Sequence, residues 1–168
     1  ELDSYLKQNK IVGLEGIDTR ALTRVLRENG TMKGIITTRV DDLTPSQIKQ
    51  KFDTYTNAYA VKEVTIDEPY TINGIGTHFA VLDCGIKQNI LRDLSKRGCK
   101  LSVFPAFTSA DEILSVNPDA IFLGNGPGDP QDIPEVVETV KKLIESGIPV
   151  LGICLGHQLI SLALGCNT

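Results

Sequence analysis

The residues best suited to chemistry surround Cys154, in the run Gly152-Ile153-Cys154-Leu155-Gly156. The apolar segment 149–153 predicts a buried strand, and the apolar pattern after the run predicts a helix. A Gly-x-Cys-x-Gly spacing at such a turn is typical of a nucleophile elbow, because the strained central residue needs small neighbours. The helix would also direct free backbone N–H groups at the sulfur, which favours the thiolate. We therefore predict that Cys154 is a nucleophile, with a buried, unreactive cysteine as the alternative.

The remaining cysteines lack this pair of flanking glycines, and we predict that Cys84, Cys99 and Cys166 are unreactive thiols. No two cysteines form a Cys-x-x-Cys pair, and the two histidines are not spaced with them as zinc ligands would be. A disulfide framework is typical of small secreted domains, so we expect free thiols. No metal site is predicted.

A second candidate feature is the glycine loop, residues 124–130, with the sequence Gly-Asn-Gly-Pro-Gly-Asp-Pro. Three glycines and two prolines make a rigid turn whose backbone can approach another group closely. One N–H of this loop and the N–H of Leu155 could form an oxyanion hole. A phosphate-binding loop is the weaker interpretation, because neither Gly-x-Gly-x-x-Gly nor Gly-Lys-Ser/Thr is present. A tight turn without catalytic function also remains open.

The second half of the chain must position both features. Short apolar runs alternate there with helical patterns, which is typical of a parallel sheet covered on both faces. The predicted strands are 79–82, 101–104, 120–123 and 149–153, and the predicted helices are 86–96, a short one after Thr108 or Ser109, 133–145 and 155–164. We predict a doubly wound α/β domain whose mostly parallel sheet is truncated at its C-terminus. Because the carboxyl ends of parallel strands meet at one edge, the elbow and the glycine loop should lie together.

The first half has a different character. An amphipathic helix should begin after Asp18 and end at Asn29-Gly30, a strand is predicted over 34–38, and a second helix should begin at Thr44-Pro45. The turn-rich stretch 67–77 is predicted as a linker. The expected domains are therefore 1–66, part of a small α/β front domain, and 78–168.

Composition excludes several classes of function. The formal net charge is −4, and Lys and Arg are scattered, so we expect no nucleic-acid partner. No apolar run approaches the roughly 18 residues of a membrane span, and the first residues do not resemble a signal peptide. We expect a cytoplasmic protein.

The combination of the two features resembles the class I, triad-type glutamine amidotransferases. Two further segments narrow the resemblance to the small subunits of carbamoyl-phosphate synthetases: Gly16-Ile17-Asp18-Thr19-Arg20-Ala21-Leu22-Thr23-Arg24 and Asp83-Cys84-Gly85-Ile86-Lys87-Gln88-Asn89-Ile90-Leu91-Arg92. The first of these lies outside the amidotransferase domain, and other amidotransferases lack it. The resemblance covers essentially the whole chain and implies a piece that lacks both ends of the subunit.

The resemblance also implies roles for single residues. Cys154 would attack the glutamine carboxamide, Gly126 and Leu155 would donate to the oxyanion, and Gly128 and Gln158 would bind glutamine. Ammonia would pass to a large subunit, which uses ATP, Mg²⁺ and bicarbonate to make carbamoyl phosphate for pyrimidine or arginine synthesis. No cofactor is expected in this chain.

The general base is the missing part of the predicted site. A cysteine nucleophile needs a base and a group that orients it. His157, three residues after Cys154, is better suited to helix packing, and His78 should lie at the opposite end of its strand. In the resembled family, the catalytic His and Glu follow downstream of the elbow, so we do not expect these 168 residues to complete the triad.

Two alternatives stay open. The chain could serve another synthase, such as one that makes anthranilate or GMP. It could also be a degenerate, non-catalytic scaffold.

Overall fold

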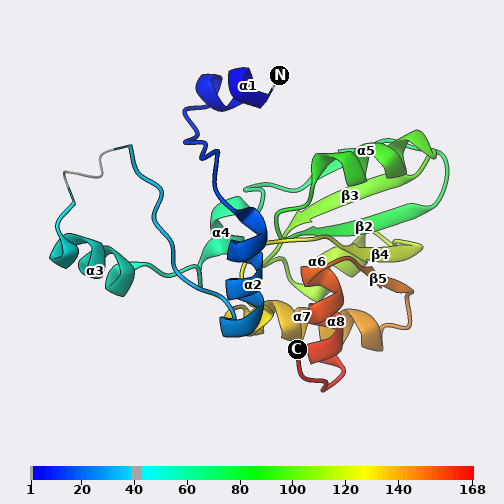
Figure 1. Cartoon of the computed structure of the whole chain (residues 1–168). Coiled ribbons are helices and arrows are strands. Elements are labelled where there is room, and N and C mark those ends of the chain that lie inside the picture. The colour runs from blue at the N-terminus through cyan, green and yellow to red at the C-terminus, as the bar shows by residue number, and fades with distance from the viewer. Residues whose placement is uncertain (1, 39–42) are drawn as a thin grey trace. The chain divides into compact units, whose positions relative to one another are not determined.

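The computed structural model describes residues 2–38 and 43–168. The chain divides into two units, and the boundary in the sequence falls between Tyr55 and Thr56. Unit 2, from Thr56 onward, contains a five-stranded sheet with the order β1-β3-β2-β4-β5 (Figure 1). Its strands are β1 Tyr70–Ile72, β2 His78–Asp83, β3 Lys100–Pro105, β4 Ala120–Leu123 and β5 Val150–Gly152. Strands β2 to β5 pair in parallel, whereas β1 pairs with β3 in the antiparallel direction.

Helices cover both faces of this sheet. They are α4 Ala60–Val64, α5 Gln88–Lys96, α6 Ala110–Ser115, the 3₁₀ helix η2 Pro130–Asp132, α7 Pro134–Glu145 and α8 Leu155–Ala163. On one face, Leu91 of α5 packs against alternate strand residues such as Val81 and Val103. On the other face, α6, α7 and α8 pack against Leu82 and Leu123. The predicted doubly wound α/β fold is confirmed, with each predicted strand and helix of this region within a few residues of its expected bounds.

The segment predicted as a linker contains an element of the sheet. Strand β1 lies within 67–77, and unit 2 already begins at Thr56, because Val61 of α4 is buried in its core. Three strand residues bounded by turns give too short an apolar run for a sequence-based assignment.

Unit 1 contains α1 Leu2–Gln8, α2 Thr19–Asn29 and α3 Pro45–Thr54. The predicted caps are present: Asp18 accepts a hydrogen bond from the N–H of Ala21 (2.9 Å), and Thr44 forms a capping box with Gln47. None of the side chains described in this unit is buried. These helices therefore form from local interactions and not around a core of their own.

The prediction of a strand over 34–38 was wrong. These residues form no strand, and Lys33 just before them donates to the carbonyl of Tyr55 (2.9 Å) and to that of Phe52 at the end of α3. A strand needs a partner for its backbone groups, and the described part of unit 1 contains no other strand. An apolar, β-branched sequence alone does not supply one.

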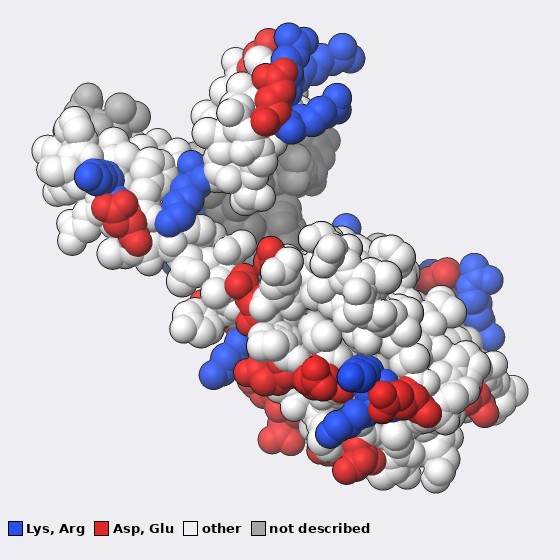
Figure 2. All heavy atoms as spheres, turned by 90° about the horizontal axis from the view of Figure 1, so that it is seen from below, with Lys and Arg blue, Asp and Glu red and all other residues white. Residues whose placement is uncertain are grey.

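No helix among the described residues is both long and apolar enough to cross a bilayer. On the face of unit 2 that Figure 2 shows, acidic side chains lie beside basic ones. This view therefore shows no basic surface of the kind that binds a phosphate backbone.

Candidate active site

Cys154 lies at a sharp turn between β5 and α8. Its backbone angles are φ 54° and ψ −113°, and it is one of three non-glycine residues with positive φ in the described chain. Residues other than glycine adopt these backbone angles only where the surrounding structure enforces them. The Cys154 side chain is exposed. The predicted strained turn is therefore present, and it presents the sulfur to solvent.

The two glycines beside Cys154 make this turn possible. A methyl group on Gly152 would lie 2.6 Å from the backbone of Gly156, and one on Gly156 would lie 2.3 Å from the carbonyl oxygen of Leu123. Both obstacles are backbone atoms, which cannot move aside as the end of a flexible side chain can. Any side chain at either position would therefore force the backbone to shift.

The turn is hydrogen-bonded to the glycine loop that follows β4. The N–H of Ile153 donates to the carbonyl of Leu123 (3.0 Å), and the N–H of Gly156 donates to that of Gly124 (3.1 Å). The elbow and the loop therefore lie together at the carboxyl edge of the sheet, as expected.

Gly126 lies next to Leu155. A methyl group on Gly126 would come within 2.7 Å of Leu155 Cδ2 and within 2.3 Å of the carbonyl oxygen of Cys84. Leu155 is almost fully buried, so its position at the start of α8 is fixed by packing. Among the hydrogen bonds of the described residues, neither the Gly126 N–H nor the Leu155 N–H has an acceptor. Both N–H groups are thus free to donate to a ligand, which is one of the requirements of an oxyanion hole.

The other two predicted substrate-binding residues occupy different places. Gln158 is exposed on α8, one helical turn after Cys154, and its N–H donates to the Cys154 carbonyl (3.1 Å). Gly128 has φ +84°, and a methyl group there would be nearest to Asn57 and to Ala60 of α4. The structure thus brings Gln158 to the elbow but turns Gly128 toward α4.

The remaining thiols have different surroundings. Cys84 is fully buried, and burial, with the Asp83 carboxylate as the smaller cause, raises the pKa of its thiol to about 12. This agrees with the prediction that Cys84 is unreactive. Cys99 is half-buried, whereas Cys166 is exposed after α8, so burial does not account for the predicted inertness of Cys166.

The two histidines lie at different ends of the sheet. His78 begins β2, at the opposite end from the elbow, and its Nε2 lies 2.8 Å from Ser102 Oγ. Burial, followed by the charge of Lys100, lowers the pKa of His78. His157 is exposed on the first turn of α8. No group of three or more potential metal ligands occurs among the described residues.

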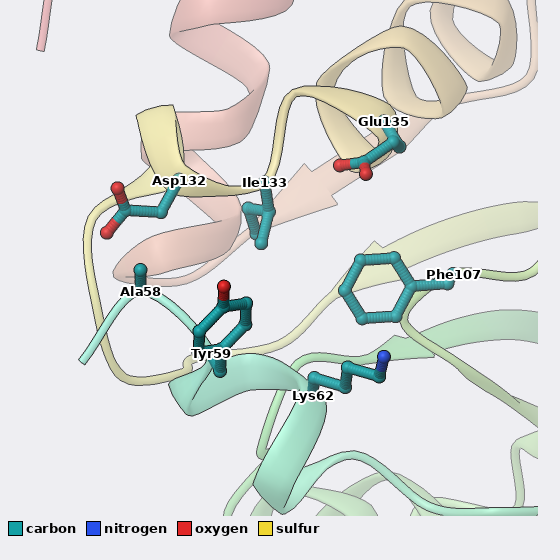
Figure 3. A pocket seen from close by; sticks show the side chains of 7 residues that line it. All are labelled: Ala58, Tyr59, Lys62, Phe107, Asp132, Ile133 and Glu135. Atoms are coloured by element: carbon teal, nitrogen blue, oxygen red, sulfur yellow. The ribbon is translucent and has the colours of Figure 1, made fainter. Parts of the chain in front are cut away.

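A hollow of about 550 Å³ lies beside α4, between the loop after β3 and the start of α7 (Figure 3). The rings of Tyr59 and Phe107 and the side chains of Lys62 and Glu135 line it, with Ala58, Asp132 and Ile133. Cys154 is not among the residues that line this hollow.

One buried polar network behind the glycine loop was not predicted. Asp83 is only 4% exposed, and Oδ1 of its carboxylate accepts hydrogen bonds from the N–H groups of Gly85 (2.8 Å) and Ile86 (2.7 Å). The signal that could have found it is an aspartate directly before a Cys-Gly turn, because Asp side chains commonly accept from backbone groups two residues on.

Comparison with known proteins agrees with this geometry. The family model for class-I glutamine amidotransferases matches residues 80–168, the region that carries the loop and the elbow. The chain belongs to this family. A second model, the carbamoyl-phosphate synthase small chain CPSase domain, matches residues 1–36 of the same amidotransferase chain.

Curated relatives match over the whole chain. The carbamoyl phosphate synthase small chain of Clostridium perfringens is 52% identical over 100% of this chain and 47% of its own length. The corresponding protein of Caldanaerobacter subterraneus is 52% identical over 98% of this chain and 44% of its own length. The amidotransferase chain thus spans about half the length of these relatives. A solved structure described as a putative GMP synthase protein from Thermoplasma acidophilum matches 53% of this chain and 45% of that one, with 27% identity and a TM-score of 0.47.

Proposed function

We propose that the chain is part of a carbamoyl phosphate synthase small subunit, in which Cys154 hydrolyses glutamine to supply ammonia. The observation that carries this proposal is the adjacency of the strained cysteine turn to the glycine loop, with unused N–H groups on Gly126 and Leu155. The relatives named above and the match of residues 1–36 favour carbamoyl phosphate synthesis over another synthase.

The chemistry follows from this arrangement. The Cys154 sulfur attacks the carboxamide carbon of glutamine, and the oxygen of the tetrahedral intermediate accepts hydrogen bonds from Gly126 and Leu155. Breakage of the C–N bond releases ammonia, which takes up a proton as it leaves, and leaves a glutamyl thioester. Water then hydrolyses the thioester to glutamate and the free thiol. Gln158 and Gly128 are proposed to contact the substrate.

The acid–base pair for these steps is proposed to lie outside the described residues. His78 lies at the opposite end of its strand from the elbow, and His157, on the first turn of α8, is better suited to helix packing than to the role of a base. The relatives are about twice as long as this chain, which leaves room for the downstream His and Glu that the family resemblance implies. ATP and Mg²⁺ are proposed to act on a large partner subunit in the cytoplasm, for pyrimidine or arginine synthesis.

The experiment uses the full-length small subunit with its large subunit. Cys154→Ser should abolish glutamine-dependent carbamoyl phosphate synthesis, because a serine hydroxyl ionises far less readily than a thiol and is the weaker nucleophile. Ammonia-dependent synthesis should continue at the rate of the unsubstituted protein. Cys166→Ser, the other exposed cysteine, is the matched control and should keep both activities. Glutamine use retained by Cys154→Ser would exclude the assignment.

A further inference from the structure

The glycine loop rests on the turn that follows β2. The Nδ2 group of Asn125 donates to the carbonyl of Gly85 (3.2 Å), and its Oδ1 accepts from the N–H of Lys87 (3.1 Å). Gly126 lies directly against the Cys84 carbonyl. A shift of this turn therefore moves the Gly126 N–H as well.

The same turn is held from the other side by the residues that follow α4. Thr65 Oγ1 donates to the backbone carbonyl of Asp83 (2.6 Å) and accepts from the N–H of Ala106 (2.9 Å). The N–H of Ile66 donates to Asp83 Oδ2 (3.1 Å). The two carboxylate oxygens of Asp83 thus serve different purposes, since Oδ1 binds the turn and Oδ2 binds the segment after α4.

Side-chain packing joins the same parts. A methyl group on Gly85 would meet Val64 Cγ2 at 2.7 Å and Pro127 Cδ at 3.2 Å, so both residues lie against Gly85. Ala60 lies near Gly128 at the far end of the loop. Residues 57–66 therefore lie near the glycine loop at Gly128 and against the turn at Gly85, on which the loop rests.

We infer that Thr65 and Asp83 are positioning residues for the amidotransferase reaction, which hold the Gly126 N–H where the oxyanion forms. This inference rests on the proposed function. An oxyanion donor is effective only when its place is fixed before the reaction begins. Thr65 precedes residues 80–168, the range that matches the amidotransferase family, so this support comes from the segment that leads into the family's domain.

Asp83→Asn tests the inference in the full-length subunit with its large subunit. The remaining Oδ1 can still accept from Gly85 and Ile86, but an Nδ2 group would face the Ile66 N–H, and two donors cannot bond. Of the contact with the segment after α4, only the Ile66 bond is lost, because Thr65 still donates to the backbone carbonyl of residue 83. Thr65→Val removes the other half of this contact while keeping the side chain's shape. Thr71→Val, on the exposed side of β1, is the matched control.

The readout is kcat and KM for glutamine per active site, with sites counted by complete labelling with 6-diazo-5-oxo-L-norleucine. Loss of a whole oxyanion donor costs about 10²- to 10³-fold in kcat, so a displaced donor should cost about 10-fold. We expect this fall in Asp83→Asn and Thr65→Val, with KM changed less than about twofold and ammonia-dependent synthesis unchanged. Thr71→Val should match the unvaried protein.

A purely structural role gives a different result. Both variants would then melt at lower temperature but keep the unvaried kcat per labelled site, and this outcome overturns the inference while the proposed function stands. If Asp83→Asn does not fold, Thr65→Val decides the question alone. If the unvaried protein hydrolyses no glutamine, the proposed function fails and the inference fails with it.

Discussion

At the scale of single residues, two cysteines that follow strands of the same sheet, β2 and β5, have opposite properties. Cys154 follows β5 in a strained turn and is exposed, whereas Cys84 follows β2 and is fully buried. Reactivity of a thiol requires access and a stabilised thiolate, and the fold provides access only at Cys154 of these two. The difference arises from the flanking glycines, which let the backbone at Cys154 turn outward.

The raised pKa of Cys84 predicts how stability depends on pH. The native thiol keeps its proton until about pH 12, whereas the unfolded thiol loses it near its ordinary value of 9.0. The buried, protonated Cys84 thiol therefore contributes fully to the free energy of unfolding below pH 9. This contribution is lost between pH 9 and 12, by up to about 1.4 kcal/mol per pH unit. Denaturant unfolding of the unvaried protein and of Cys84→Ala across this range measures the effect. The free energy of unfolding of Cys84→Ala should fall less steeply with pH than that of the unsubstituted protein. Equal slopes would contradict the raised pKa of Cys84.

At the scale of elements, the geometry of the candidate site depends on close contact between β4, the elbow and α8. The N–H of Gly156 donates to Gly124, and the Cα of Gly156 lies against the Leu123 carbonyl. No side chain intervenes between these backbones, so the glycines set the distance between the loop and the sulfur. Adding even a methyl group at these glycines should therefore lower the stability of the protein strongly.

Gly156→Ala should destabilise the protein by about 3 kcal/mol or more, because its methyl group would overlap a backbone oxygen. Gly34→Ala is the matched control, since nothing lies within 4 Å of a methyl group at that position, and it should change stability by less than about 0.5 kcal/mol. Urea unfolding measures both changes. Equal stability of the two variants would show that the elbow is not packed as described.

The sequence predicted most of these elements but not all. Apolar runs such as 120–123 predicted buried strands because a parallel sheet covered on both faces makes every position of a strand apolar. The run 34–38 has the same character, yet pairing with a distant strand decides whether such a run becomes one. The short strand β1 was missed because pairing with β3, and not its own pattern, defines it.

The candidate site shows the same division. Cys154 and the glycine loop could be predicted because their geometry requires glycines at fixed spacings within a few residues. The contacts of Thr65 and Asp83 could not, because they join side chains to backbone groups 17 and 18 residues away, and only the fold brings those together. Local requirements leave a pattern in the sequence, whereas long-range hydrogen bonds leave none.

At the scale of the whole molecule, the two units differ in how they are stabilised. Unit 2 has two clusters of buried apolar side chains, one on each face of its sheet. The described residues of unit 1 contribute no buried side chain, and Leu22, Val25 and Leu26 of α2 remain 39–48% exposed. Its helices thus lack the packing that normally stabilises helices of this length.

Hydrogen exchange of the 168-residue chain should show this difference. Backbone amides in β2 and β4 should exchange only on global unfolding, and those in α2 should exchange many times faster through local opening. Mass spectrometry of peptides after timed exchange near neutral pH measures both. Equal protection of α2 and β2 would contradict the view that unit 1 has no core.

The central claim is that Cys154 forms a covalent bond with the carbonyl carbon of glutamine. Its most direct test is peptide mapping of the full-length protein after reaction with 6-diazo-5-oxo-L-norleucine, a glutamine analogue that traps such a nucleophile. We predict one adduct per chain on the peptide containing Cys154, at a rate that added glutamine lowers. An adduct on Cys84, Cys99 or Cys166 instead, or no adduct in a protein that still hydrolyses glutamine, would contradict the claim.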